Sequence, residues 1–95
     1  MNLRNRVNHV LNSAPRQAPY FFFPSRDGGD GWIMEESSGG AESVIIRWHW
    51  KDPTRRDHEL RAELLKPIAA FLGTHRFAVA QRVDERGPFL RVTDR

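Results

Sequence analysis

The sequence predicts an α+β fold with the element order α-β-β-α-β-β, in which a four-stranded antiparallel sheet has two helices packed on one face. Three observations support this. Apolar residues recur at helical spacing in two segments, alternate with polar residues in a third, and elsewhere fall into short runs between glycine-containing turns. The chain has 95 residues, close to the commonest domain size, so we expect one small domain over residues 1–95.

Residues 43–50 form the expected central strand. Large apolar side chains occupy every second position, which is the period of a strand with one buried face. We expect the indoles of Trp48 and Trp50 to pack beneath the helices, and His49 between them to face water. Residues 32–36 precede this strand across a Ser-Ser-Gly-Gly turn, so the two segments are predicted to form an antiparallel hairpin.

The first helix is predicted over residues 2–14. Asn2 is a suitable N-cap because its side chain can accept a free backbone N–H, and Pro15 is expected to stop the helix. Its predicted apolar stripe consists of Leu3, Val7, Val10, Leu11 and Ala14.

The second helix is predicted over residues 54–72, with Asp52 or Thr54 as its N-cap. Arg61 is assigned to the solvent-facing flank. Pro67 lies inside the apolar pattern and removes one backbone donor, so we expect a kink or a break there. Its buried stripe is predicted to consist of Leu60, Leu64, Ile68 and Phe71 or Leu72, with Leu65 and Ala69 alongside.

Two further strands are predicted at residues 75–83 and 89–93, joined by a turn at residues 84–88. With the first hairpin they complete the sheet. The predicted core consists of Leu3, Val7, Leu11, Val44, Ile46, Trp48, Leu60, Leu64, Ile68, Leu72, Phe77, Val79, Leu90 and Val92. The outer face of the sheet is predicted to present Ile45, Arg47, His49, Ala78, Ala80, Arg82 and Arg91.

The connector between the first helix and the first strand contains the aromatic run Tyr20-Phe21-Phe22-Phe23. Prolines at positions 15, 19 and 24 argue against a central strand there. Two interpretations stay open: the rings close the core beneath the sheet edge, or they form an exposed patch for a partner. The glycine-rich stretch at residues 27–31 is interpreted as a turn, because it lacks the remaining ligands of a calcium loop.

Composition limits the classes of function. The net charge is +3 and the pI about 10.2, with thirteen arginines and two lysines. This charge is compatible with nucleic-acid binding but does not require it. Cysteine is absent, which excludes disulfides and thiol chemistry and fits a cytoplasmic protein. No apolar run approaches membrane-spanning length, so we expect no membrane partner.

No motif for catalysis or for a cofactor is present. The four histidines lack metal-ligand spacing, the serines lack a nucleophile elbow, and the glycine-rich stretch lacks the lysine of a phosphate loop. We therefore expect no catalytic, cofactor-binding or metal-binding residues, and no enzymatic activity.

Two binding functions remain. The first, which the modest charge favours, is a small accessory protein that binds a host or partner protein through a free sheet edge or through an aromatic patch containing Tyr20 and Phe22; edge pairing can also produce a homodimer. The alternative is nucleic-acid binding by the basic outer face, where cations surround an aromatic ring. The candidate contacts on that face are Arg47, His49, Arg82, Arg91 and Phe89.

The layout resembles that of small proteins from high-GC actinobacteria and from their phages or mobile elements. The likeness spans most of the chain, is one of layout and composition, and carries over no functional residues. It implies a cytoplasmic accessory protein, such as a phage or mobile-element factor that acts on a host protein or nucleic acid. It rests on the first-helix stripe Leu3, Val7 and Leu11, on Gly31-Trp32-Ile33-Met34, Val44-Ile45-Ile46-Arg47-Trp48, the helix at residues 64–72, Phe77-Ala78-Val79 and Leu90-Arg91-Val92.

Overall fold

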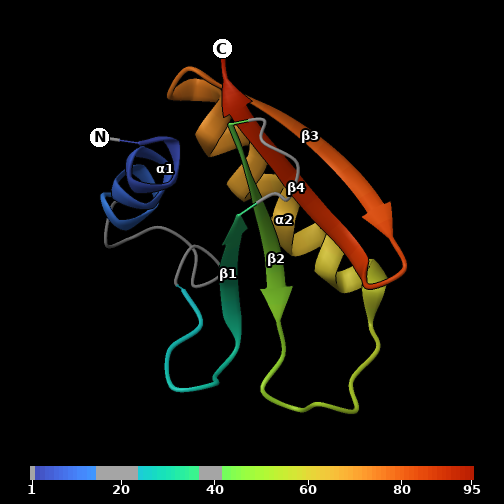
Figure 1. Cartoon of the computed structure of the whole chain (residues 1–95). Coiled ribbons are helices and arrows are strands. Elements are labelled where there is room, and N and C mark those ends of the chain that lie inside the picture. The colour runs from blue at the N-terminus through green and yellow to red at the C-terminus, as the bar shows by residue number, and fades with distance from the viewer. Residues whose placement is uncertain (1, 15–23, 37–41) are drawn as a thin grey trace.

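The computed structural model describes residues 2–14, 24–36 and 42–95. Its element order confirms the predicted α-β-β-α-β-β arrangement (Figure 1). The four strands form one antiparallel sheet in the order β1-β2-β4-β3, so β2 and β4 are central and β1 and β3 are the edges. The elements are α1 (Leu3–Asn12), β1 (Gly31–Glu36), β2 (Ser43–His49), α2 (His58–Thr74), β3 (Phe77–Asp84) and β4 (Gly87–Asp94).

Helix α1 begins as predicted, because the side chain of Asn2 accepts a hydrogen bond from the backbone N–H of Asn5 at 2.8 Å. The helix ends at Asn12, before the proline that was expected to stop it. Arg6, in its early turns, forms an ion pair with Asp94 at the end of β4 and so ties the helix to the sheet. Of the predicted stripe, Leu3, Val7 and Leu11 are buried, whereas Val10 and Ala14 are half-buried.

Helix α2 begins later than predicted. Asp57 is its N-cap and accepts a hydrogen bond from the N–H of Leu60 at 3.0 Å. The predicted cap, Asp52, instead accepts bonds from the backbone N–H and the hydroxyl of Thr54, at 2.9 and 2.8 Å, within the preceding turn.

Helix α2 also continues through Pro67, so the predicted break is wrong. A proline in a helix interior costs about 3 kcal/mol relative to alanine. The helix survives this cost because buried leucine and isoleucine side chains on both sides of the proline hold it against the sheet. These residues are Leu64, Leu65, Ile68 and Leu72.

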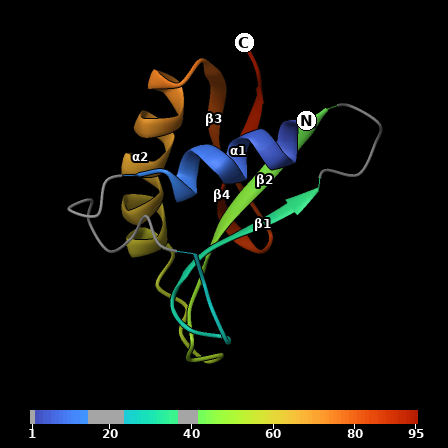
Figure 2. The same ribbon diagram turned by 90° about the vertical axis from the view of Figure 1, so that its left-hand side faces the viewer.

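The core lies between the sheet and the two helices, and α1 runs across the direction of α2 (Figure 2). Most of the predicted core is confirmed. Leu60 is an exception, since it is 36% exposed, whereas Leu65 is fully buried. Trp48 and Trp50 are both buried as expected, with their rings in edge contact at 5.9 Å between centroids. Trp32 is buried as well.

The outer face is confirmed by the register. Ile45 pairs with Arg91 and Arg91 with Ala80, so these side chains lie on one face, away from the buried pair Val44 and Val92.

The two hairpins diverge toward the ends of β2 and β3 (Figure 1). Strands β2 and β4 pair only from Ser43↔Thr93 to Ile46↔Leu90, although both continue beyond that point. Continuing the register would place Pro88 opposite Trp48, and proline has no N–H to donate to β2. The ladder therefore stops, and a wedge opens between the hairpins.

Candidate functional site

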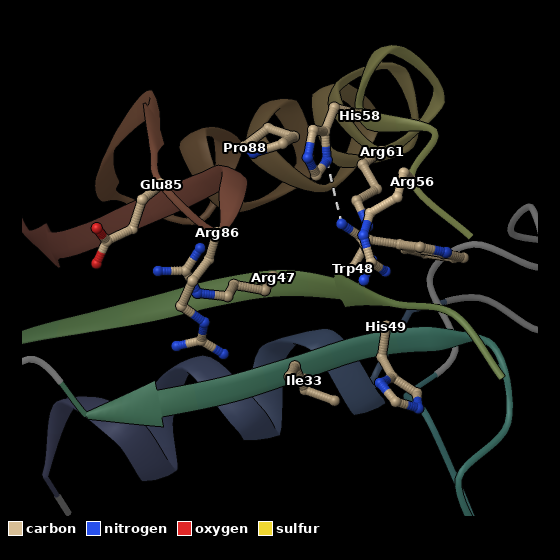
Figure 3. Close-up of a pocket in the computed structure, with 10 residues that line it drawn as sticks. All are labelled: Ile33, Arg47, Trp48, His49, Arg56, His58, Arg61, Glu85, Arg86 and Pro88. Atoms are coloured by element: carbon tan, nitrogen blue, oxygen red, sulfur yellow. Dashed lines mark hydrogen bonds between the residues drawn. The ribbon is translucent and has the colours of Figure 1, made fainter. Parts of the chain in front are cut away.

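A cleft of about 340 Å³ occupies this wedge (Figure 3). The end of β2 forms one wall, the turn between β3 and β4 forms another, and the chain leading into α2 closes the third side. Its polar lining is dominated by cationic and imidazole groups, and among the described residues Glu85 is the only carboxylate that lines it. In Figure 3 the carboxylate of Glu85 lies on the side of Arg47 and Arg86 and points away from Arg56 and Arg61.

Arg47 closes the wedge toward the outer face. Its Nη1 and Nη2 donate to the two carboxylate oxygens of Asp84 on β3, at 3.1 and 2.6 Å, and its Nε donates to Glu35 on β1 at 3.1 Å. The guanidinium also lies over the Phe89 ring, 4.9 Å from its centroid. These contacts leave the Arg47 side chain 11% exposed. Arg47 is therefore a structural clamp and does not offer a free charge.

The turn between β3 and β4 adds a second arginine to this network. Arg86 binds both carboxylate oxygens of Glu35, at 3.1 and 2.9 Å. The hydrogen bonds from Arg86 and Arg47 hold the pKa of Glu35 below its usual value, and the bonds from Arg47 do the same for the pKa of Asp84. The network thus joins both hairpins across the gap.

On the helix side of the cleft, the charge is not balanced. Arg56 and Arg61 lie close together, and within the described part of the chain neither forms an ion pair (Figure 3). Burial lowers the pKa of Arg61 below its usual value, and repulsion from Arg56 and Arg47 lowers it further. A partly buried cation without a counter-ion is unfavourable, and an anion in the cleft would relieve that cost.

Two N–H donors at the cleft also lack an acceptor. Among the described residues, the buried Nε of Arg61 and Nε1 of Trp48 have no hydrogen-bond partner. Buried donors are usually satisfied in folded proteins. Within the same part of the chain, Trp50 Nε1 and Ser43 Oγ, which do not line the cleft, are unsatisfied as well, so these donors are compatible with a ligand that supplies acceptor oxygens but do not single out the cleft.

His58 positions Arg61. Its Nδ1 lies 3.1 Å from Nη1 of Arg61 and must be the acceptor, because a guanidinium only donates. The imidazole lies against Gly87, where an added Cβ would be 2.7 Å from the ring. Gly87 also has a φ of +109°, so both its backbone and its lack of a side chain are required here.

The candidate residues on the outer face have different surroundings. Arg82 and Arg91 are exposed and, within the described residues, form no ion pair. Both border a shallow hollow of about 340 Å³ that is floored by alanines. Phe89 is half-buried beneath Arg47. His49 is half-buried, and its Nε2 lies 3.3 Å from the carbonyl of Gly28.

The aromatic-patch prediction, with Tyr20 and Phe22, lies outside the described residues.

The sequence analysis placed Arg61 on the solvated flank of its helix, and this was wrong. Arg61 shares the spacing of the buried residues Leu65, Ile68 and Leu72, which follow it at i+4, i+7 and i+11. A cation on the buried stripe of an amphipathic helix was the signal. It was missed because the stripe was started at Leu60.

Comparisons with known protein families, with curated proteins and with solved structures find no match to this chain. In the described part of the chain, no helix is long and apolar enough to cross a membrane. The same residues contain no group of three or more histidine or acidic side chains placed to hold a metal ion.

Proposed function

We propose that the protein binds single-stranded nucleic acid, with a backbone phosphate in the cleft and the adjoining nucleotides on the outer face of the sheet. The observation that carries this proposal is the pair Arg56 and Arg61, two guanidinium groups that converge on one cleft without a carboxylate partner among the described residues. Arginine binds phosphate through two parallel N–H bonds, which makes it the preferred side chain for such a site.

The size and shape of the cleft favour a single strand. A volume of about 340 Å³ accommodates one phosphate and part of a nucleoside, and α2 closes the inner side. Ile33 and Pro88 supply apolar walls beside the cations. A duplex presents its phosphates on a wide convex surface and does not enter such a space.

The outer face supplies the continuation of the path. Arg82 lies opposite Phe89 in the register, and Arg47 covers that ring from the neighbouring strand. Arg82 and Arg91 border the alanine-floored hollow, which leaves room for a flat base or a sugar between two cations. Single-strand binders combine a cationic path with flat surfaces in this manner.

The test is fluorescence anisotropy with a labelled single-stranded oligonucleotide of about 12 nucleotides, titrated at several salt concentrations. If Arg56, Arg61, Arg82 and Arg91 each contact one phosphate, log K falls with log salt with a slope of about −3, and each Arg→Gln substitution reduces the slope by about 0.7. Arg76→Gln is the matched control, because this substitution removes the same charge. Arg76 is exposed and directly precedes β3, at the end of the strand that lies away from the cleft.

Three outcomes would contradict the proposal. The first is absence of binding at low salt, and the second is an equal loss of affinity in Arg61→Gln and Arg76→Gln. The third is equally tight binding of polyglutamate, because an acidic polypeptide carries the charge without the bases and would point to a protein partner.

A further inference from the structure

We infer that the protein forms a two-fold symmetric dimer in which β3 pairs with β3 of a second copy, so that two sheets join into one of eight strands. This inference goes beyond the proposed binding of nucleic acid and does not depend on it. Three observations carry it: an uncovered edge strand, an exposed apolar side chain on that strand, and a groove that fits this side chain.

The edge at β3 is open. In the described part of the chain, no segment pairs with its outer side, although the strand is eight residues long. The opposite edge is different, because Pro24 bridges to Trp32 of β1 and the N–H of Ser25 donates to the carbonyl of Trp32 at 2.9 Å. A long, open edge is a template for pairing with another strand.

The backbone groups that face the open edge follow from the register. Val83 lies opposite Pro88, and a hydrogen-bonded pair would need the N–H that proline lacks, so this is a non-hydrogen-bonded pair in which the backbone of Pro88 faces β2 and that of Val83 faces away from β4. We therefore assign the backbone groups of Val83 to the free edge, and because these groups alternate along a strand, those of Gln81 and Val79 face the same way. Residues 77–81 carry no charge that would oppose pairing.

The side chains favour one register, with the two-fold axis at Gln81. This register places Val83 of each copy opposite Val79 of the other, on the face of the sheet that carries the helices. Val83 is 77% exposed in the isolated chain, so a partner would cover apolar surface that is now in water. Leu60 on α2, 36% exposed, is the other large apolar side chain on the surface of the described residues.

Val79 borders a groove of about 540 Å³ between β3 and the C-terminal half of α2. The groove is lined mostly by small or apolar groups, including Ala69, Ala70, Gly73 and Phe77, and Arg95 also lines it. In the same register Val83 of the second copy enters this groove, and Glu85 of that copy lies opposite Phe77, close to the positive charge of Arg95. Each copy offers both the projecting valine and the groove, which is the self-complementarity that a two-fold interface requires.

Pairing of the two β3 strands also joins the outer faces of the two sheets into one continuous face. Arg82 would lie opposite Ala80 of the second copy, so no two like charges face each other within the paired strands. Because the contact consists of one strand edge and a small apolar patch, we expect an association at the weak end of specific interfaces, with dissociation in the micromolar range.

The oligomeric state is measured by sedimentation velocity over a series of protein concentrations, for the whole chain and two variants. Val83→Lys and Ala70→Lys each place a charge in the contact, at the projecting residue and in the groove, while leaving the buried core of the single chain unchanged. Both are expected to remain monomeric at concentrations where the unchanged chain dimerises. Asn8→Lys on the exposed side of α1 adds the same charge elsewhere and is expected to dimerise normally.

Cysteine cross-linking tests the register. The chain has no cysteine, so any disulfide comes from an introduced residue. Gln81→Cys on the axis brings two Cβ atoms within about 5 Å, close to disulfide geometry. Val83→Cys is the control, because its two copies would be roughly 13 Å apart along the strands.

Rapid oxidation of the Gln81→Cys variant to a covalent dimer, with slow oxidation of the control, is the expected result. A chain that stays monomeric at every concentration, a dimer that tolerates both lysine substitutions, or equal cross-linking of the two cysteine variants would overturn the inference.

Discussion

Arg47 on β2 binds both carboxylate oxygens of Asp84 at the end of β3, with N–O distances of 3.1 and 2.6 Å. The two strands are not neighbours in the sheet, since β4 lies between them. The ion pair therefore spans the wedge where β2 and β4 have stopped pairing, and it replaces the missing ladder. It also removes Arg47 from the set of charges that a ligand can use.

The ion pairs among Arg47, Glu35, Asp84 and Arg86 make the stability of the fold depend on pH. The pKa values of Glu35 and Asp84 are lowered in the folded state, so their contribution is present above the unfolded carboxyl pKa of about 4 and is lost as the pH falls through the lower folded value. Arg47→Met keeps the stem over Phe89 but removes the charge. We expect its melting temperature to lie below that of the unchanged chain at about pH 7 and to approach it at about pH 3.

Thermal melts followed by circular dichroism across this pH range test the idea. Glu63→Gln, which alters an exposed carboxylate paired with Lys66 on α2, is the control and is expected to leave the pH profile unchanged. If the melting temperatures of Arg47→Met and of the unchanged chain fall by the same amount as the pH is lowered, the ion network does not determine how stability depends on pH.

Gly87→Ala is expected to destabilise the fold by about 2–4 kcal/mol, because it combines a positive φ with a clash. The added Cβ would lie 2.7 Å from the His58 ring. Gly28→Ala is the control: φ there is +77°, but open space surrounds the position, so only the backbone cost of about 1 kcal/mol applies. Urea denaturation measures both.

The double variant His58→Ala, Gly87→Ala separates the two causes. It should regain the part of the loss that comes from the clash and keep the part that comes from the backbone. If the double variant is no more stable than Gly87→Ala, the imidazole contact is not the source of the cost.

Leu65→Ala is expected to cost about 2–5 kcal/mol, since Leu65 is fully buried and truncation leaves a cavity. Leu60→Ala, on the exposed part of the same helix, is expected to cost less than about 1 kcal/mol. The free energies of unfolding in urea should therefore differ clearly between two substitutions that are chemically identical. Similar losses would mean that the face of α2 is assigned incorrectly.

Pro67→Ala is expected to stabilise the chain by about 1–3 kcal/mol, because it restores a backbone donor inside a helix that is already continuous. Lys66→Ala, one position earlier on the exposed surface, is the control for a simple change in helix propensity. A lower melting temperature in Pro67→Ala would indicate that the proline ring makes packing contacts that outweigh the missing bond.

Much of the fold followed from periodicity. The alternation in β2 placed Trp48 and Trp50 inside, and the stripe of α1 placed Leu3, Val7 and Leu11 inside, as observed. Boundaries were less accurate, because Asp52, Thr54 and Asp57 are all chemically suitable caps and local sequence does not choose among them.

The candidate site was predicted less well than the fold. Arg47, His49, Arg82, Arg91 and Phe89 do belong to the outer face or its rim. The cationic pair that defines the cleft was not predicted as a pair. Arg56 and Arg61 line one cleft with the turn between β3 and β4 because the start of α2 lies beside that turn in the fold.

What the sequence by itself determined is the set of elements and the side of each that is buried, because burial imposes a period of two on strands and 3.6 on helices. The tertiary structure alone decided where two hairpins separate and which charges meet in the gap. That depends on pairing between strands far apart in the chain, on a proline without a donor in β4, and on an arginine that the helix packing directs inward. The residues next to each other in the chain do not determine contacts between distant segments, so these contacts are seen only in the folded structure.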